Sequence, residues 1–185
     1  PGVFDNGIDD ATFCKIIAII RIAVPYTGMI ISTRENQAVR EKALHLGISQ
    51  ISGGSRTSVG GYTEDVRPTD TEQFDVSDQR SLDEVIEWLM ELGFLPSFCT
   101  ACYRAGRTGD RFMELCKSKQ IQNCCHPNAL LTLKEYLEDY ASPATKALGE
   151  KLVQAELSNI PQEKVREVCI ERLQKIAQGE RDFRF

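Results

Sequence analysis

Apolar and polar positions alternate in two different ways along the chain. In roughly the first hundred residues, stretches with helical periodicity are separated by short apolar runs of the kind that form buried strands. The predicted elements of this part are helices over residues 10–23, 33–45 and 82–92 and strands over residues 28–32, 48–52 and 94–98. Such alternation of helices and strands predicts parallel α/β structure.

Residues at the ends of these helices support their boundaries. Ser32 stands three residues before Glu35, and positions 81 and 84 repeat this Ser/Glu pair, so each pair predicts a capping box at a helix start. Gly47 and Gly93 follow the same two helices, and glycine commonly ends a helix. The short strands between them are expected of a parallel sheet that helices cover on both sides or that closes as a barrel.

From Thr108 onward the pattern predicts helices only, over residues 109–117, 134–140, 143–158 and 161–178. Three strand–helix units cannot close an eight-stranded barrel, which takes about 250 residues. The chain also begins at Pro1 without an initiator methionine. We therefore expect it to be a fragment of a longer protein.

Composition and charge exclude several classes of function. The chain has 185 residues, 42% of them hydrophobic and 26% charged, as in ordinary globular proteins. Its net charge is −5 and its basic residues are scattered, so we expect no nucleic-acid partner. The longest apolar run, residues 15–24, contains Arg21 and is shorter than the about 20 residues that cross a bilayer. Seven cysteines, an odd number, without a signal-peptide pattern favour reduced thiols and a cytoplasmic protein.

Five of the seven cysteines lie in the stretch SFCTACYRAGRTGDRFMELCKSKQIQNCCHP, residues 97–127. Cys99 and Cys102 form a C-x-x-C pair just after the strand predicted at 94–98, where α/β folds place reactive groups. A third metal ligand could be Cys124 or Cys125, returned to the site by a helical hairpin. Three arginines between them could supply positive charge to an iron–sulfur cluster: Arg104, Arg107 and Arg111.

Four interpretations of these thiols remain open from the residues alone. They are an iron–sulfur site, a zinc site, a thioredoxin-like dithiol and buried structural cysteines. The zinc site would use Cys99, Cys102 and Cys125 with either Cys124 or His126. Three cysteines are expected in the core instead of at the site: Cys14, Cys116 and Cys169.

A second candidate site follows the strand predicted at 28–32. Arg34 would lie in the first turn of a helix, where the dipole favours negative charge, so an arginine there indicates an anionic ligand. A substrate carboxylate could be bound by Arg34 with the Ser32 hydroxyl and helix N–H groups. The alternative is a solvated surface arginine. The glycine-rich loop SGGSRTSVGGY, residues 52–62, could approach a ligand closely or be a plain flexible loop.

Four segments together resemble one family: AVPYTGMIISTRE, GISQISGGSRTSVGGY, PSFCTACYRAGRTGDRFMEL and GERDF. They are similar to the C-terminal part of the radical S-adenosylmethionine (SAM) tyrosine lyases that mature [FeFe]-hydrogenase. The most specific motif is C-x-x-C followed, after 22 intervening residues, by Cys125. The related 2-iminoacetate synthases of thiamine biosynthesis share the barrel segments and are not expected to share this spacing.

The resemblance implies the last strand–helix units of a (β/α)8 TIM barrel in residues 1–98 and a helical C-terminal domain in residues 99–185. It implies that Cys99, Cys102 and Cys125 hold an auxiliary iron–sulfur cluster, a 4Fe-4S core with a possible extra iron. It also implies that Ser32 and Arg34 hold the tyrosine carboxylate.

The parent enzyme would cleave SAM at a first 4Fe-4S cluster, split tyrosine into p-cresol and dehydroglycine, and convert dehydroglycine to CO and cyanide. Its binding partners would be tyrosine, SAM and hydrogenase maturation proteins. It is not expected to bind a membrane. The C-x-x-x-C-x-x-C motif of the first cluster is absent from this sequence. The chain by itself is therefore expected to be inactive.

Overall fold

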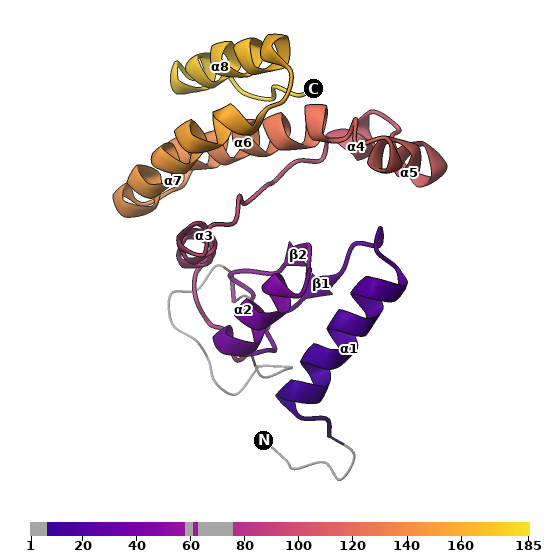
Figure 1. Cartoon of the computed structure of the whole chain (residues 1–185). Coiled ribbons are helices and arrows are strands. Elements are labelled where there is room, and N and C mark those ends of the chain that lie inside the picture. The colour runs from indigo at the N-terminus through magenta and orange to yellow at the C-terminus, as the bar shows by residue number, and fades with distance from the viewer. Residues whose placement is uncertain (1–6, 58–60, 63–75) are drawn as a thin grey trace. The chain divides into compact units, whose positions relative to one another are not determined.

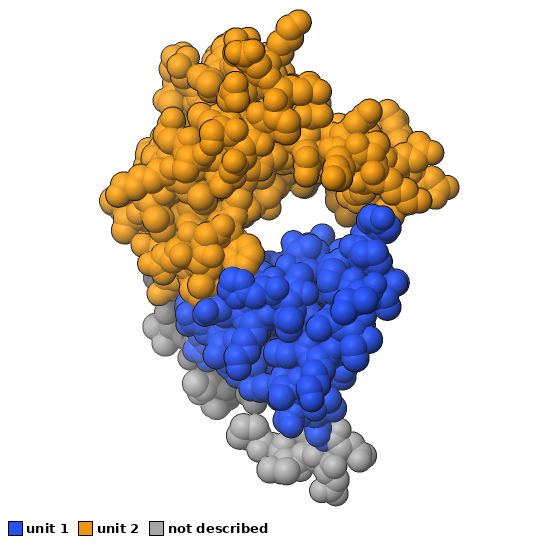
Figure 2. Space-filling view, viewed as in Figure 1, with its two compact units in different colours: residues 1–82 blue, residues 83–185 orange. Residues whose placement is uncertain are grey.

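The computed structural model describes residues 7–57, 61–62 and 76–185. The chain divides into two compact units, Pro1–Leu82 and Asp83–Phe185 (Figure 2). The domain boundary predicted between residues 98 and 99 lies inside the second unit. No helix in the described ranges is long and apolar enough to cross a membrane.

The first unit contains a short parallel sheet. Its elements are α1 (Asp10–Ala23), β1 (Ile30–Ile31), α2 (Gln37–His45) and β2 (Gln50–Ile51) (Figure 1). Ile30 pairs with Gln50 and Ile31 with Ile51 in parallel register, which confirms the predicted parallel α/β structure for these elements. The inner face of α2 and β1 forms an apolar core of Ile31, Val39, Ala43 and Leu44.

Helix α2 begins later than the sequence predicts. Its N-cap is Asn36, whose side-chain oxygen accepts a hydrogen bond from the backbone N–H of Val39 at 3.0 Å. The predicted capping box of Ser32 and Glu35 is therefore wrong. Asparagine caps helices as well as serine does, and the helix starts after Asn36 instead of Ser32. The predicted end is confirmed, with Gly47 at φ +100°.

All the regular secondary structure described in the second unit is helical. Its elements are α3 (Leu82–Glu91), α4 (Ala101–Arg104), α5 (Gly109–Lys117), α6 (Gln122–Asp139), α7 (Pro143–Glu156), the 3-10 turn η2 (Leu157–Asn159) and α8 (Glu163–Ala177). Helix α6 packs against both α7 and α8 (Figure 1). It contributes the fully buried side chains of Leu130, Leu131, Leu133 and Leu137 to the core.

Two predictions for this unit are wrong. Residues 94–98 form no strand, because Pro96 has no N–H to donate and the backbone N–H of Phe98 donates instead to the Thr132 hydroxyl of α6 at 3.2 Å. Helix α6 begins at Gln122, twelve residues before its predicted start, and continues through Pro127. Proline lacks an N–H and usually interrupts a helix interior, so Pro127 disguises the early start of α6. Cys124 and Cys125 consequently lie in the first turn of α6.

Asp83 ties α3 to the rest of the second unit. Its carboxylate accepts hydrogen bonds from the Tyr136 hydroxyl at 3.0 Å, the Thr145 hydroxyl at 2.8 Å and the Ser142 backbone N–H at 3.3 Å. Burial of Asp83 acts to raise its pKa, but these bonds outweigh burial and the pKa lies below its usual value.

Candidate functional site

The C-x-x-C pair is built into a single helical turn. Cys99 precedes α4, and its sulfur accepts a hydrogen bond from the backbone N–H of Ala101 at 3.4 Å. Cys102 lies within α4, and its carbonyl accepts from the backbone N–H of Arg107 at 2.8 Å. Both thiols are half-buried. Hence the turn holds two thiols that solvent or a ligand can reach.

The third candidate thiol lies at the start of α6. The backbone N–H of Cys125 donates to the Ile121 carbonyl at 2.7 Å, and the Cys124 thiol donates to the same carbonyl at 3.3 Å. Burial raises the pKa of the Cys125 thiol to about 12, and the neighbouring thiols of Cys124, Cys102 and Cys99 add to this rise. A hydrogen-bonded link connects the two segments: the Phe185 carbonyl accepts from Arg107, five residues after Cys102, and from Asn128, three residues after Cys125.

Cys116 of α5 belongs to the same neighbourhood. Burial is the largest cause that raises the pKa of the Cys116 thiol, and the charges of Cys102 and Cys124 raise it further. It is half-buried and α5 has no buried residue, so the predicted core position of Cys116 is wrong. Cys169 is fully buried, as predicted, and burial raises its pKa to about 11. Cys14 is half-buried on α1 in the first unit, so its predicted core position is wrong as well.

The donor chemistry of this cysteine site fits an iron–sulfur cluster or zinc, since both take thiolates. Within the described ranges, no three His, Cys, Asp or Glu side chains are arranged to hold a metal ion. The thiols therefore belong to neighbouring segments but are not arranged around one metal position. His126 contacts the Glu156 carbonyl at 3.1 Å and its carboxylate at 3.4 Å, which does not favour the zinc set that includes His126.

The arginines of the cysteine site contact the C-terminus of the chain. Arg104 forms a two-bond ion pair with Asp182, at 2.5 and 2.9 Å, and Arg107 donates to the Phe185 carbonyl at 2.9 Å. A cavity of about 120 Å³ lies beside Cys99 and is bordered by Arg104, Asn128 and Asp182. The two arginines therefore have acceptors other than sulfur.

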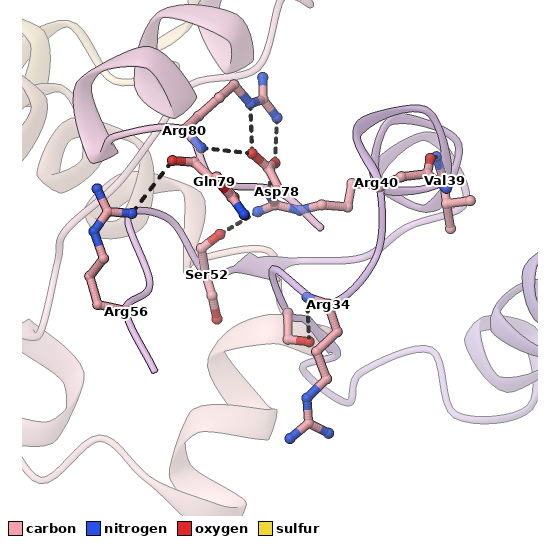
Figure 3. A network of polar contacts seen from close by, with 10 residues as sticks. Arg34, Val39, Arg40, Ser52, Arg56, Asp78, Gln79 and Arg80 are labelled. Atoms are coloured by element: carbon pink, nitrogen blue, oxygen red, sulfur yellow. Dashed lines mark hydrogen bonds and ion pairs between the residues drawn. The ribbon is translucent and has the colours of Figure 1, made fainter. Parts of the chain in front are cut away.

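The second candidate site lies in the first unit, at the carboxyl end of β1. The Ser32 hydroxyl accepts a hydrogen bond from the backbone N–H of Arg34 at 3.3 Å, and both residues are exposed. Arg34 lies in a turn before α2 and not in its first helical turn, so the predicted conflict with the helix dipole does not arise. Its side chain points away from the polar network around Asp78 (Figure 3).

That network is the feature that sequence reasoning missed (Figure 3). The fully buried Arg40 forms an ion pair with Asp78 and donates to the Ser52 carbonyl. The Arg80 guanidinium donates two hydrogen bonds to the same carboxylate, at 2.9 and 2.6 Å. The backbone N–H of Asp78 donates to the Thr33 carbonyl at 3.0 Å. The network thereby fixes the chain just beyond both strands.

The charges of this network shift one another's pKa values. Burial acts to raise the pKa of Asp78, but hydrogen bonds from Arg80 and the charge of Arg40 outweigh it and hold the pKa below its usual value. Burial lowers the pKa of Arg40, and Asp78 opposes that shift. One signal was present in the sequence: Arg40 lies on the same helix face as the apolar residues of α2.

The glycine-rich loop follows β2 and is described in part. The backbone N–H of Arg56 donates to the Tyr62 hydroxyl at 3.2 Å, and its guanidinium donates to the Gln79 carbonyl at 3.5 Å. Gly54 has φ +64° and would bring a Cβ within 3.1 Å of the Leu82 nitrogen. Residues 58–60 lie outside the described ranges. Ligand binding by this loop stays a prediction.

Comparison with protein families assigns the first half of the chain. Residues 3–95 match the Biotin and Thiamin Synthesis associated domain, and this stretch is half of the 185 residues. The chain belongs to this family. The 2-iminoacetate synthase of Salmonella typhimurium is 30% identical over 89 residues, which are 48% of this chain and 23% of that protein. The enzyme of Escherichia coli is 29% identical over the same length.

Solved structures extend the similarity over nearly the whole chain. The crystal structure of HydG, described as a maturase of the [FeFe]-hydrogenase, has a TM-score of 0.91 and 53% identity and covers 98% of this chain. HydG from Carboxydothermus hydrogenoformans has a TM-score of 0.69 and 38% identity over 93% of it. The resemblance to the hydrogenase-maturing enzymes is therefore confirmed. The chain spans 39% and 35% of these two proteins.

Proposed function

We propose that this chain is the C-terminal part of a radical SAM tyrosine lyase of [FeFe]-hydrogenase maturation and carries its auxiliary iron–sulfur site. The observation that supports this most is the extent of the similarity to HydG. It covers 98% of the chain, whereas the 2-iminoacetate synthases match 48%. The similarity to HydG includes the second unit, which carries the cysteine site, and this favours the hydrogenase-maturing type of enzyme. The parent would use SAM and tyrosine, act with other maturation proteins and be cytoplasmic.

The first unit is proposed to be part of a (β/α)8 barrel. Two features support this interpretation. Its two strands are parallel and joined through a helix, which is the repeating unit of such barrels. Its apolar side chains Ile19, Ile22 and Ile30 are 64%, 81% and 67% exposed, as expected of surfaces that further strands and helices would cover.

In the cysteine site, Cys99, Cys102 and Cys125 are proposed to hold the auxiliary cluster. When bound, the cluster would supply iron at which dehydroglycine yields CO and cyanide. The chain's own task is to present three thiols from two segments, the turn at α4 and the start of α6. Cys124 donates to the Ile121 carbonyl and is proposed to stay outside the ligand set.

Anaerobic reconstitution with iron and sulfide tests the cluster proposal. The wild-type chain should become brown and bind iron and sulfide, whereas Cys99→Ser, Cys102→Ser and Cys125→Ser should each lose most of both. Cys124→Ser is the matched control, because it removes the adjacent thiol, and should keep its iron. Colourless wild-type protein with stoichiometric zinc would instead support a zinc-stabilised interaction module without catalysis. In that case Cys125→Ser should unfold the helices, because structural zinc contributes directly to folding.

Ser32 and Arg34 are proposed to bind the tyrosine carboxylate at the carboxyl end of β1. Both are exposed there, and the Arg34 guanidinium could form two parallel bonds to a carboxylate. In the full-length parent, Arg34→Ala should weaken tyrosine binding by about 10-fold or more, since hydrogen bonds to charged groups contribute about 1.5–3 kcal/mol. Lys42→Ala, an exposed cation on α2, is the control. Unchanged affinity of Arg34→Ala would identify Arg34 as an ordinary surface residue.

A second candidate is a 2-iminoacetate synthase of thiamine biosynthesis, which the 30% identity over 89 residues favours. The two functions differ in products. A hydrogenase-maturing parent should release CO and cyanide from tyrosine, whereas a 2-iminoacetate synthase should stop at dehydroglycine. Product analysis of the full-length protein with tyrosine and SAM distinguishes them.

A further inference from the structure

The last five residues of the chain contact both segments that carry the candidate thiols. This C-terminal segment (residues 181–185) follows α8 and returns along α6. Asp182 binds the Arg104 guanidinium through two bonds, at 2.5 and 2.9 Å. Arg104 is the last residue of α4, two positions after Cys102. The segment thereby holds the C-x-x-C turn from its C-terminal side.

The same segment also holds the start of α6. The backbone N–H of Phe185 donates to the Asn128 side-chain oxygen at 2.8 Å, and the Asn128 amide donates back to the Phe185 carbonyl at 3.4 Å. Asn128 is 2% exposed and lies three residues after Cys125. Because that carbonyl also accepts from Arg107, one backbone group connects the two cysteine-bearing segments.

Further contacts fix the segment itself. The Asp182 backbone N–H donates to the Glu135 carboxylate of α6 at 2.7 Å. The guanidinium of Arg172 on α8 donates to the Arg184 carbonyl at 3.0 Å and lies 4.3 Å from the centre of the Phe185 ring. The segment is therefore held by α6 and α8 while it binds the C-x-x-C turn.

We propose that the C-terminal segment is a clasp that sets the spacing between the C-x-x-C turn and the start of α6, with Asp182 and Arg104 as its positioning residues. This rests on the proposed cluster site, where three thiols from two segments must meet. The Phe185 carbonyl joins Arg107 to Asn128 of α6, and Asp182 joins Arg104 to Glu135 of α6. Neither residue is proposed to contact the cluster.

The test uses the reduced, metal-free chain and a short thiol–thiol cross-linker, dibromobimane. Mass spectrometry measures the yield of cross-links between the segment with Cys99 and Cys102 and the segment with Cys124 and Cys125. Asp182→Asn keeps a residue that tolerates the observed φ of +69° and removes the charge. We expect this variant and Arg104→Gln each to lower the yield about two- to fivefold, the range of an exposed ion pair. The cross-link yield of the double variant should be no lower than that of the single variant with the lower yield.

Glu171→Gln is the matched control. It breaks an ion pair of 2.6 Å with Lys175, of similar exposure, within α8 and outside both cysteine-bearing segments. Its cross-link yield should equal that of the wild type. Circular dichroism should show unchanged helix content in every variant. Loss of helix in Asp182→Asn would show that the segment is a folding element and would overturn the clasp.

A second readout is the rate at which reconstituted protein releases iron to a ferrous chelator, which should rise two- to fivefold in Asp182→Asn and stay unchanged in Glu171→Gln. Equal cross-link yields in wild type and all variants would overturn the clasp whether or not iron binds. If wild-type protein takes up no iron but its cross-link yield depends on Asp182, the cluster proposal fails and the clasp stands.

Discussion

Replacing Asp78 with alanine should destabilise the first unit more than any surface change. The Arg40 and Asp78 side chains are 0% and 2% exposed, so their ion pair is removed from water. Asp78→Ala leaves the Arg40 guanidinium buried without its carboxylate partner, and breaking a buried pair in this way costs about 3–5 kcal/mol. A typical domain has about 5–15 kcal/mol of unfolding free energy in total. A large share of the first unit's stability should therefore be lost.

Hydrogen exchange followed by mass spectrometry measures this effect in the peptide that contains α2, separately from the second unit. A loss of about 3–5 kcal/mol corresponds to exchange about 10²–10³-fold faster or more, since about 1.4 kcal/mol is tenfold. The double variant Arg40→Met/Asp78→Leu should recover most of the protection, because apolar residues of similar size often replace a buried pair at little cost. Exchange less than tenfold faster in Asp78→Ala would refute the reasoning.

The pH dependence of wild-type exchange gives an independent check of the same pair. The pKa of Asp78 is lower in the folded chain than in the unfolded chain, so the unfolded chain binds more protons at acidic pH. The stabilisation is then complete above the unfolded value of about 3.9 and is lost as pH falls through the folded pKa. Asp78→Ala should lack this component of acid destabilisation.

The remaining predictions concern the second unit. Asp83→Ala should lower its unfolding free energy by about 1–3 kcal/mol, because three donors on α6 and α7 lose their acceptor, and urea titration with unchanged midpoint would contradict this. Gly149→Ala should lower the melting temperature, since the new Cβ would lie 2.6 Å from both terminal carbons of the buried Leu137 and overpacking costs about 1–3 kcal/mol; a higher melting temperature would show that helix propensity prevails. Cys169→Ser should cost about 1–3 kcal/mol in urea titration, because it buries a hydroxyl at a fully buried position, and wild-type stability would indicate a hidden acceptor.

The helices were largely predictable because their signals are local. Asp9 caps α1 through a bond from the Thr12 N–H at 2.7 Å, and Gly93 ends α3 with φ +81°, both readable from short sequence patterns. The start of α6 could not be predicted from such local patterns. Pro127 is a strong local signal for a break, yet tertiary packing of the leucines that follow keeps the helix continuous.

The candidate sites were predictable as residue types but not as arrangements. The C-x-x-C motif and the pair at 124–125 are visible in the sequence, whereas the position of Cys116 depends on the turn between α5 and α6, where the Ile121 N–H donates to the Leu115 carbonyl at 3.2 Å. The pairing of Asp78 with Arg40 spans 38 residues and follows no periodicity. The contact of Asp182 with Arg104 spans 78 residues and likewise depends on the tertiary fold.

Mössbauer spectroscopy of the chain reconstituted with ⁵⁷Fe tests the central claim most directly, because it reports the iron environment without any need for activity. The wild-type and Cys124→Ser proteins should show the signals of a sulfur-ligated four-iron cluster, and Cys125→Ser should show only unbound iron. A wild-type spectrum with no cluster signal, together with stoichiometric zinc in the same protein, would contradict the assignment of Cys99, Cys102 and Cys125 as cluster ligands.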